Sequence, residues 1–125
     1  MKKLIFAATL MLSFVMFTAF TTDNESNKYK HIVGTWEYIA ADAPYEYSEG
    51  DLIFSVEKGK LVGIVDIQGY KMDLEDVKAN GNTVQFFLNV EGEDLDIKMN
   101  FKGKTFKGTA TFSQGTLPFE GKKVK

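Results

Sequence analysis

The chain contains no cysteine, and this absence excludes several kinds of chemistry and of stabilisation. Disulfide bonds, thiolate metal ligands and a cysteine nucleophile are ruled out, as is a lipid attached to a cysteine behind a leader segment. The folded part must therefore be stable through packing alone, and about 100 residues are enough for an independent but modest core.

Arginine is also missing, because all 15 basic residues are lysines. The 17 acidic residues outnumber them, and the formal net charge of the chain is -2 at pH 7. A nucleic-acid-binding protein needs a basic footprint, usually with arginine side chains that grip phosphate in a bidentate manner. We therefore expect no nucleic-acid partner.

Histidine occurs once, as His31, at the junction between a polar leader and the first predicted strand. A serine triad needs a histidine beside its nucleophile, and no G-x-S-x-G motif accompanies His31. Zinc needs further nitrogen or sulfur ligands, which are not available here. With no phosphate-binding loop either, the sequence indicates a non-catalytic protein with no metal site and no cofactor.

An export signal is the first feature that the sequence does contain. Lys2 and Lys3 precede an apolar run over residues 4–20, and polar residues 21–28 end this run. This order is typical of a signal peptide, which we place at residues 1–21. The run is barely long enough to cross a membrane, so an uncleaved anchor is the alternative. We expect the protein to be exported, either periplasmic or secreted, and to contact a membrane only if the segment stays uncleaved.

Beyond this segment, apolar and polar residues alternate with a period of two, which is the pattern of half-buried antiparallel strands. Short glycine turns such as Asn80-Gly81 separate the runs at intervals that favour hairpins. The predicted strands cover residues 32–40, 51–57, 60–67, 70–78, 82–90, 94–102, 104–113 and 116–123.

These features predict an all-β fold, an antiparallel up-and-down meander of about eight short strands. The meander is expected to close into a barrel, because closure removes unpaired sheet edges, and a two-sheet β-sandwich is the alternative. A single barrel domain then spans residues 31–125, behind a polar leader over residues 22–30. Its one long connection, residues 42–50, lies between the first two strands.

The first strand opens with Gly34-Thr35-Trp36, which resembles the G-x-W signature of the lipocalins and the wider calycin group. The chain also resembles short exported bacterial domains that begin with a similar motif and repeat strand–glycine–strand hairpins. The resemblance implies a lipocalin-like barrel whose tryptophan packs across one closed end and whose other end admits a small apolar ligand. Gly34 and Trp36 are therefore assigned structural roles. The chain departs from the family in having no arginine to pack on the tryptophan.

Acidic residues gather in two places, around residues 73–76 and 91–96. Converging carboxylates bind calcium, and a carboxylate pair at the correct separation in a cleft hydrolyses glycosides. Charges at strand faces and hairpin tips also protect sheet edges from pairing with other chains. No aromatic platform accompanies the acids in sequence, and we favour solvated strand faces and turns over either site.

Aromatic residues supply the candidate binding site. Phenylalanine occurs 11 times, mostly at inward positions of the predicted strands. An eight-stranded barrel either fills its interior with such side chains or holds one small ligand. The long first connection would cover an opening of the barrel, and loops on a rigid scaffold often carry function. The candidate ligand-binding residues are Tyr45, Tyr47, Phe54, Phe86, Phe101 and Phe112.

Two functions follow from these observations. In the first, the barrel binds a small apolar or amphipathic ligand between phenylalanine-lined walls. In the alternative, it is an envelope or secreted interaction protein with a filled core, which binds a protein partner through its loops or outer face. The volume of the interior distinguishes the two.

Overall fold

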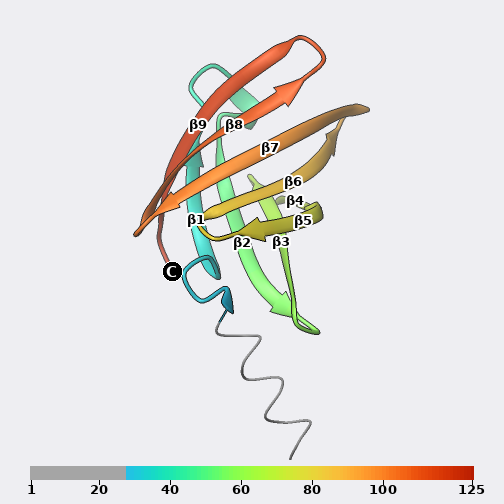
Figure 1. The fold of residues 1–125 in the computed structure, drawn as a ribbon. Coiled ribbons are helices and arrows are strands. Elements are labelled where there is room, and N and C mark those ends of the chain that lie inside the picture. Colours follow the sequence, from blue (N-terminus) through green and yellow to red (C-terminus); the bar gives the residue numbers. More distant parts are fainter. Residues whose placement is uncertain (1–27) are drawn as a thin grey trace, which may run out of the picture.

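The computed structural model describes residues 28–125, and Figure 1 shows their fold. The predicted signal peptide and most of the predicted leader therefore lie outside the described residues. Within residues 28–125, no helix has the length and apolar character needed to cross a membrane.

The described residues form nine strands and one short 3-10 helix, η1, which lies in the long first connection. The strands are β1 (Gly34–Ile39), β2 (Glu49–Glu57), β3 (Lys60–Ile67), β4 (Tyr70–Asp73), β5 (Glu75–Asn80), β6 (Thr83–Val90), β7 (Glu93–Lys102), β8 (Thr105–Phe112) and β9 (Gly115–Lys123), and η1 covers Tyr45–Tyr47.

All nine strands belong to one antiparallel sheet, in the order β4-β3-β2-β1-β9-β8-β7-β6-β5. The first and last strands of the chain lie side by side, because β1 pairs with β9 from Trp36 opposite Lys123 to Ile39 opposite Glu120. The sheet curls on itself into a nearly closed up-and-down barrel (Figure 1). The predicted meander and barrel are confirmed, and the two-sheet alternative is wrong.

The predicted strand over residues 70–78 is wrong in one respect, because it is split into β4 and β5. Leu74 separates the two pieces, and its buried side chain and its backbone N–H turn toward β3, where the N–H donates to the Gly63 carbonyl at 2.9 Å. The first piece pairs with β3 and the second with β6, and a register shift follows between Glu75 and Lys78. The barrel therefore has a seam between β4 and β5, and this seam is why closure is incomplete.

The connections divide between the two ends of the barrel. At one end lie the β1–β2 connection (40–48) and the β3–β4, β6–β7 and β8–β9 turns (68–69, 91–92, 113–114), and we call this the loop end. At the other lie the β2–β3, β5–β6 and β7–β8 turns (58–59, 81–82, 103–104) with residues 28–33 and 124–125, and we call this the closed end. In Figure 1 the β8–β9 turn stands at the top and the β2–β3 turn at the bottom.

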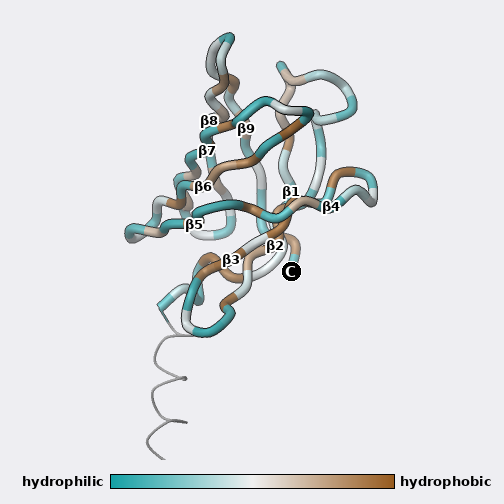
Figure 2. The backbone as a smooth tube through the Cα atoms, turned by 90° about the vertical axis from the view of Figure 1, so that its right-hand side faces the viewer, coloured by the Kyte–Doolittle hydropathy of each residue, from teal (hydrophilic) through white to brown (hydrophobic). Residues whose placement is uncertain are grey.

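Aromatic packing fills the closed end. Trp36 is fully buried, and its ring centroid lies 4.7 Å from that of Phe101 and 5.9 Å from that of Phe106, both edge-on. The indole N–H is not left unpaired, because Nε1 donates a 2.8 Å hydrogen bond to the Ile32 carbonyl. Phe54 packs edge-on against Phe101. Figure 2 shows hydrophobic and hydrophilic residues following one another along the strands.

Gly34 begins β1 and lies beside residues 124–125, which hydrogen-bond to Thr35. Its φ of +136° is rarely adopted by residues with a side chain, and a Cβ here would lie 2.5 Å from the Lys125 carbonyl oxygen. That oxygen also accepts a hydrogen bond from the Thr35 N–H at 3.1 Å. The close approach of two backbone segments therefore explains the glycine.

Gly34→Ala is expected to lower the free energy of unfolding by about 2 kcal/mol, through backbone strain together with the clash. Gly115→Ala is the matched control, because Gly115 has a φ of +145° but open space where its Cβ would be. The control should cost about 1 kcal/mol from strain alone. Urea unfolding of both variants measures the difference, and equal losses would show that the Lys125 contact is unimportant.

Candidate functional site

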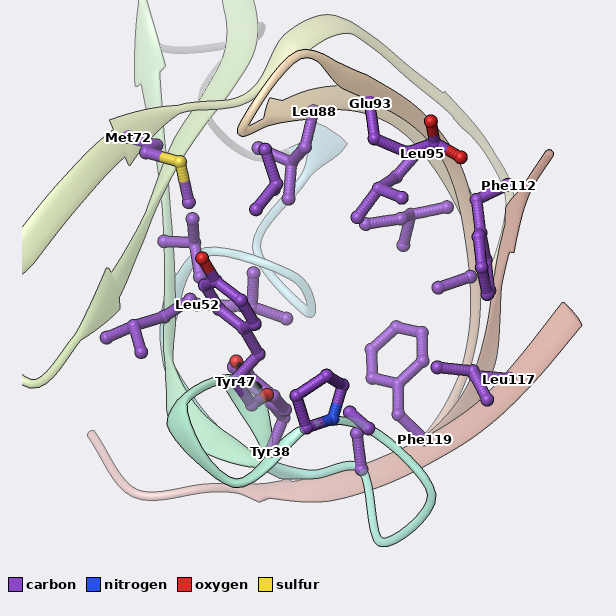
Figure 3. Close-up of a pocket in the computed structure, with 18 of the residues that line it drawn as sticks. Tyr38, Tyr47, Leu52, Met72, Leu88, Glu93, Leu95, Phe112, Leu117 and Phe119 are labelled. Carbon is purple, nitrogen blue, oxygen red and sulfur yellow. Dashed lines mark hydrogen bonds between the residues drawn. The ribbon is translucent and has the colours of Figure 1, made fainter. Parts of the chain in front are cut away.

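Above the aromatic layer, the barrel encloses an apolar cavity of about 260 Å³ toward the loop end (Figure 3). An engineered cavity of about 150 Å³ is already large enough to bind benzene. The cavity reaches the surface at the loop end, where the exposed Pro44 and Glu91 are among its lining residues. The lining consists of Tyr38, Ala40, Ala43, Pro44, Tyr47, Leu52, Val65, Ile67, Met72, Phe86, Leu88, Val90, Glu91, Glu93, Leu95, Ile97, Ala110, Phe112, Leu117, Pro118 and Phe119.

Strand register explains why the barrel is filled at one end and hollow at the other. At the closed end Phe101 of β7 lies directly opposite Phe106 of β8, so two rings occupy one layer. Toward the loop end the same two strands place Ile97 opposite Ala110, and Ala110 lies opposite Leu117 of β9. Ala110 thus lies between two aliphatic residues and leaves open, toward the loop end, a space that an aromatic ring fills at the closed end.

The β1–β2 connection covers part of the opening. Two hydrogen bonds to backbone carbonyls hold this connection in place. The Tyr38 hydroxyl donates to the Tyr47 carbonyl at 3.0 Å, and the Ala40 N–H donates to the Ser48 carbonyl at 2.8 Å. Burial raises the pKa of Tyr38 to about 12, so this hydroxyl keeps its proton at neutral pH. As a result Ala43, Pro44 and Tyr47 become part of the cavity wall.

The phenol of Tyr47 lies close enough to Glu91 of the β6–β7 turn to feel its charge. Loss of hydration raises the pKa of Tyr47, and the negative charge of the nearby Glu91 carboxylate adds to this rise. Both residues line the cavity, and they belong to two connections that border it at the loop end. The phenol therefore stays protonated and remains a hydrogen-bond donor at the edge of the cavity.

Glu93 connects the start of β7 with the β8–β9 turn. Its carboxylate accepts hydrogen bonds from the Ser113 N–H at 3.0 Å and from the Ser113 hydroxyl. These two bonds lower the pKa of Glu93 below its ordinary value of 4.5, although loss of hydration and the neighbouring Asp94 oppose the shift.

The Glu93 contact predicts a pH dependence at this edge of the cavity. Because the pKa is lower in the folded than in the unfolded protein, the contact stabilises the fold above about pH 4.5 and its contribution is lost as the pH falls through the lowered value. A carbon-13 NMR titration of the Glu93 carboxyl group measures this pKa directly. In Ser113→Ala the pKa should move part of the way back, since the backbone donor remains, and an unchanged pKa would contradict the assignment.

The structure brings together three of the six candidate binding residues. Tyr47, Phe86 and Phe112 line the cavity, from η1, β6 and β8 respectively. Phe54 and Phe101 instead belong to the aromatic packing of the closed end, and neither lines the cavity. Tyr45 is 87% exposed and is not among the lining residues. These last three do not line this cavity, because alternation shows which side chains face inward but not at which level of the barrel.

Most of the aliphatic lining was not among the candidate binding residues. Leu88, Leu95, Ile97 and Ala110 occupy inward positions of the predicted strands, but nothing in the pattern separates a wall from a filled core. Glu93 is polar, so the alternation of apolar residues does not point to it. Its place at the cavity edge becomes visible only through its contact with Ser113.

The cavity has few polar groups. Its titratable lining residues are Tyr38, Tyr47, Glu91 and Glu93, and no lysine is among the lining residues. Within the described part of the chain, no three side chains of the His, Cys, Asp or Glu type group in a way that would hold a metal ion. The chemistry that this lining supports is the burial of an apolar molecule, with hydrogen-bonding and negative groups at its edge.

Comparison with protein-family models and with curated proteins gives no match. Among solved structures, the chain is similar to a redesigned β-barrel, with a TM-score of 0.58 and 14% sequence identity over 77% of this chain and 94% of that one. It is also similar to a point mutant of the fluorescent protein UnaG, with a TM-score of 0.50 and 14% identity over 77% of this chain and 98% of that one. At this identity the similarity shows a shared β-barrel fold.

Proposed function

We propose that this protein is a non-catalytic, calycin-like binding barrel that holds a small apolar or amphipathic molecule in its interior. The observation that carries the proposal is the apolar cavity of about 260 Å³, which lies above a filled closed end and reaches the surface beside the β1–β2 connection. A filled interior would have favoured an interaction protein instead, and the cavity is therefore the reason to prefer a ligand.

The lining also restricts the charge of the ligand. A carboxylate or phosphate head group at the edge of the cavity would face Glu91 and Glu93, and no lining lysine is present to balance it. Placing like charges side by side disfavours such a ligand. The proposed ligand has an apolar body and a neutral or positively charged polar end, which the Tyr47 hydroxyl and the two carboxylates contact.

The assignment as a binding protein rather than an enzyme rests on the composition of the same cavity. Its lining has two phenols and two carboxylates but no histidine, serine or lysine. A nucleophile paired with a base would be expected in an acyl-transfer or hydrolytic site. The export of the protein is part of the proposal and is supported by the order of basic, apolar and polar residues in the first 28 positions.

Titration with the neutral dye N-phenyl-1-naphthylamine tests the proposal. The dye is fluorescent in apolar surroundings, and we expect saturable binding with one dye molecule per chain, which Ala110→Phe weakens. Its anionic relative 1-anilinonaphthalene-8-sulfonate should bind more weakly, because its sulfonate meets the two glutamates. Non-saturable binding, or binding that Ala110→Phe leaves unchanged, would overturn the proposal, and stronger binding of the anionic dye would overturn the charge preference.

A further inference from the structure

The charged residues of the barrel are sorted between its two ends. Nine lysines lie in the connections and terminal segments of the closed end or within two residues of them, and Glu57 is the one acidic residue there within residues 28–125. These lysines are Lys28, Lys30, Lys58, Lys60, Lys102, Lys104, Lys122, Lys123 and Lys125. All are exposed except the half-buried Lys123, whose Nζ lies 5.9 Å from the centroid of the Trp36 ring.

The loop end has the opposite composition. By the same criterion it contains seven acidic residues and, among the described residues, the single lysine Lys71. The acidic residues are Asp42, Glu46, Glu49, Asp66, Glu91, Glu93 and Asp94. The net charge of the chain is only slightly negative, although positive and negative charges are separated along the barrel axis.

The chain enters the barrel at its basic end. Lys28, the first described residue, lies at the closed end, and the nearby His31 contacts the carbonyl of Gly81 in the β5–β6 turn at 3.1 Å. The apolar run over residues 4–20 precedes this point in the sequence. Figure 1 shows the described N-terminal segment and the C-terminus at the end away from the β8–β9 turn.

We propose that the closed end is a docking surface for an anionic lipid membrane, and that it holds the cavity opening toward the aqueous side. Lysines close to an anionic bilayer are attracted individually, and the attraction decays within a Debye length of about 10 Å at 0.1 M salt. Nine lysines on one end supply this attraction, while the seven acidic residues at the other end are repelled. The proposal rests on the uncleaved form of the apolar run over residues 4–20, because its entry at the same end favours a bilayer over a soluble anionic partner.

Trp36 makes the orientation measurable. It is the one tryptophan of the full chain, and it lies in the closed end. Lipids that carry a nitroxide spin label on the head group quench a tryptophan only at short range. We would mix the full chain with spin-labelled vesicles of phosphatidylcholine, with and without phosphatidylglycerol. Because neutral vesicles report any contact that the apolar run alone produces, the difference between the two vesicle types isolates the docking of the barrel.

Stronger quenching in the anionic vesicles, with its loss at high salt, is the expected result. The double variant Lys102→Glu/Lys104→Glu should lower quenching in the anionic vesicles clearly, because it replaces two of the nine lysines of the closed end by acids. The control Lys71→Glu/Lys98→Glu changes the net charge equally but at the loop end and on the outer wall, and it should retain quenching. All four lysines are exposed, and we therefore expect both variants to fold. Circular dichroism checks this expectation.

Three results would overturn the proposal. Equal quenching in neutral and anionic vesicles would show that anionic lipid is not recognised. Equal losses in the two double variants would show that net charge matters and the closed end does not. Association with anionic vesicles without quenching of Trp36 would place another face on the membrane. None of these results bears on dye binding in the cavity, which is tested separately.

Discussion

Trp36→Ala is expected to lower the free energy of unfolding by about 3–5 kcal/mol. The side chain is fully buried and lies at the centre of the aromatic packing, with edge-on contacts to Phe101 and Phe106. Its removal leaves a large hole, and it also leaves the Ile32 carbonyl without its hydrogen-bond donor. Without disulfides, a domain of this size has a total stability of about 5–15 kcal/mol, and the loss is a large part of it.

Urea unfolding followed by circular dichroism measures the effect, since the variant has no tryptophan fluorescence. If Trp36→Ala does not fold, Trp36→Phe provides a milder substitution that keeps a ring and loses the hydrogen bond, at a cost of about 1–3 kcal/mol. Tyr45→Ala is the control, because Tyr45 is 87% exposed and its removal should change stability little. Similar midpoints for Trp36→Ala and Tyr45→Ala would contradict the central role of Trp36.

Ala110→Phe is expected to weaken binding of the neutral naphthylamine dye by at least about tenfold. This loss corresponds to about 1.4 kcal/mol, which is roughly the transfer free energy of two methylene groups. Ala110 lines the cavity between Ile97 and Leu117, and a ring at this position occupies the space that the ligand needs. Because the ring fills a void rather than displacing packed atoms, stability should not decrease.

Thr109→Phe is the matched control for this variant. Thr109 is the neighbour of Ala110 on β8, and its exposed side chain points to the outer face of the barrel. The same ring is therefore added to the same strand outside the cavity, and dye binding should remain. Equal weakening in the two variants would mean that the dye does not bind in the interior, whereas unfolding of Ala110→Phe would show that the cavity cannot accept a ring.

Much of the fold follows from local patterns. The period-two alternation and the glycine turns predict the strands and their antiparallel meander, because adjacent strands joined by short turns pair with each other. The split at Leu74 could not be predicted in this way. Leu74 continues the alternation of residues 70–78, and the strand breaks only because its first half pairs with β3 and its second half with β6.

The candidate site was predictable only in part. Alternation correctly indicates that Phe54, Phe86 and Phe101 face inward, since all three are buried. It does not show that Phe54 and Phe101 pack against each other at the closed end while Phe86 and Phe112 line a cavity. That distinction depends on which residues of neighbouring strands share a level of the barrel, and therefore on register.

The sequence by itself determined the all-β class, the inward face of each strand and the structural importance that we assign to Gly34-Thr35-Trp36. These depend on residues close in the chain, whose spacing shows their direction. The tertiary structure decided where the interior is filled, which carboxylates border the opening, and that lysines and acidic residues occupy opposite ends. Such features arise when strands distant in sequence, such as β1 and β9, pair in one register and bring separate turns to the same end.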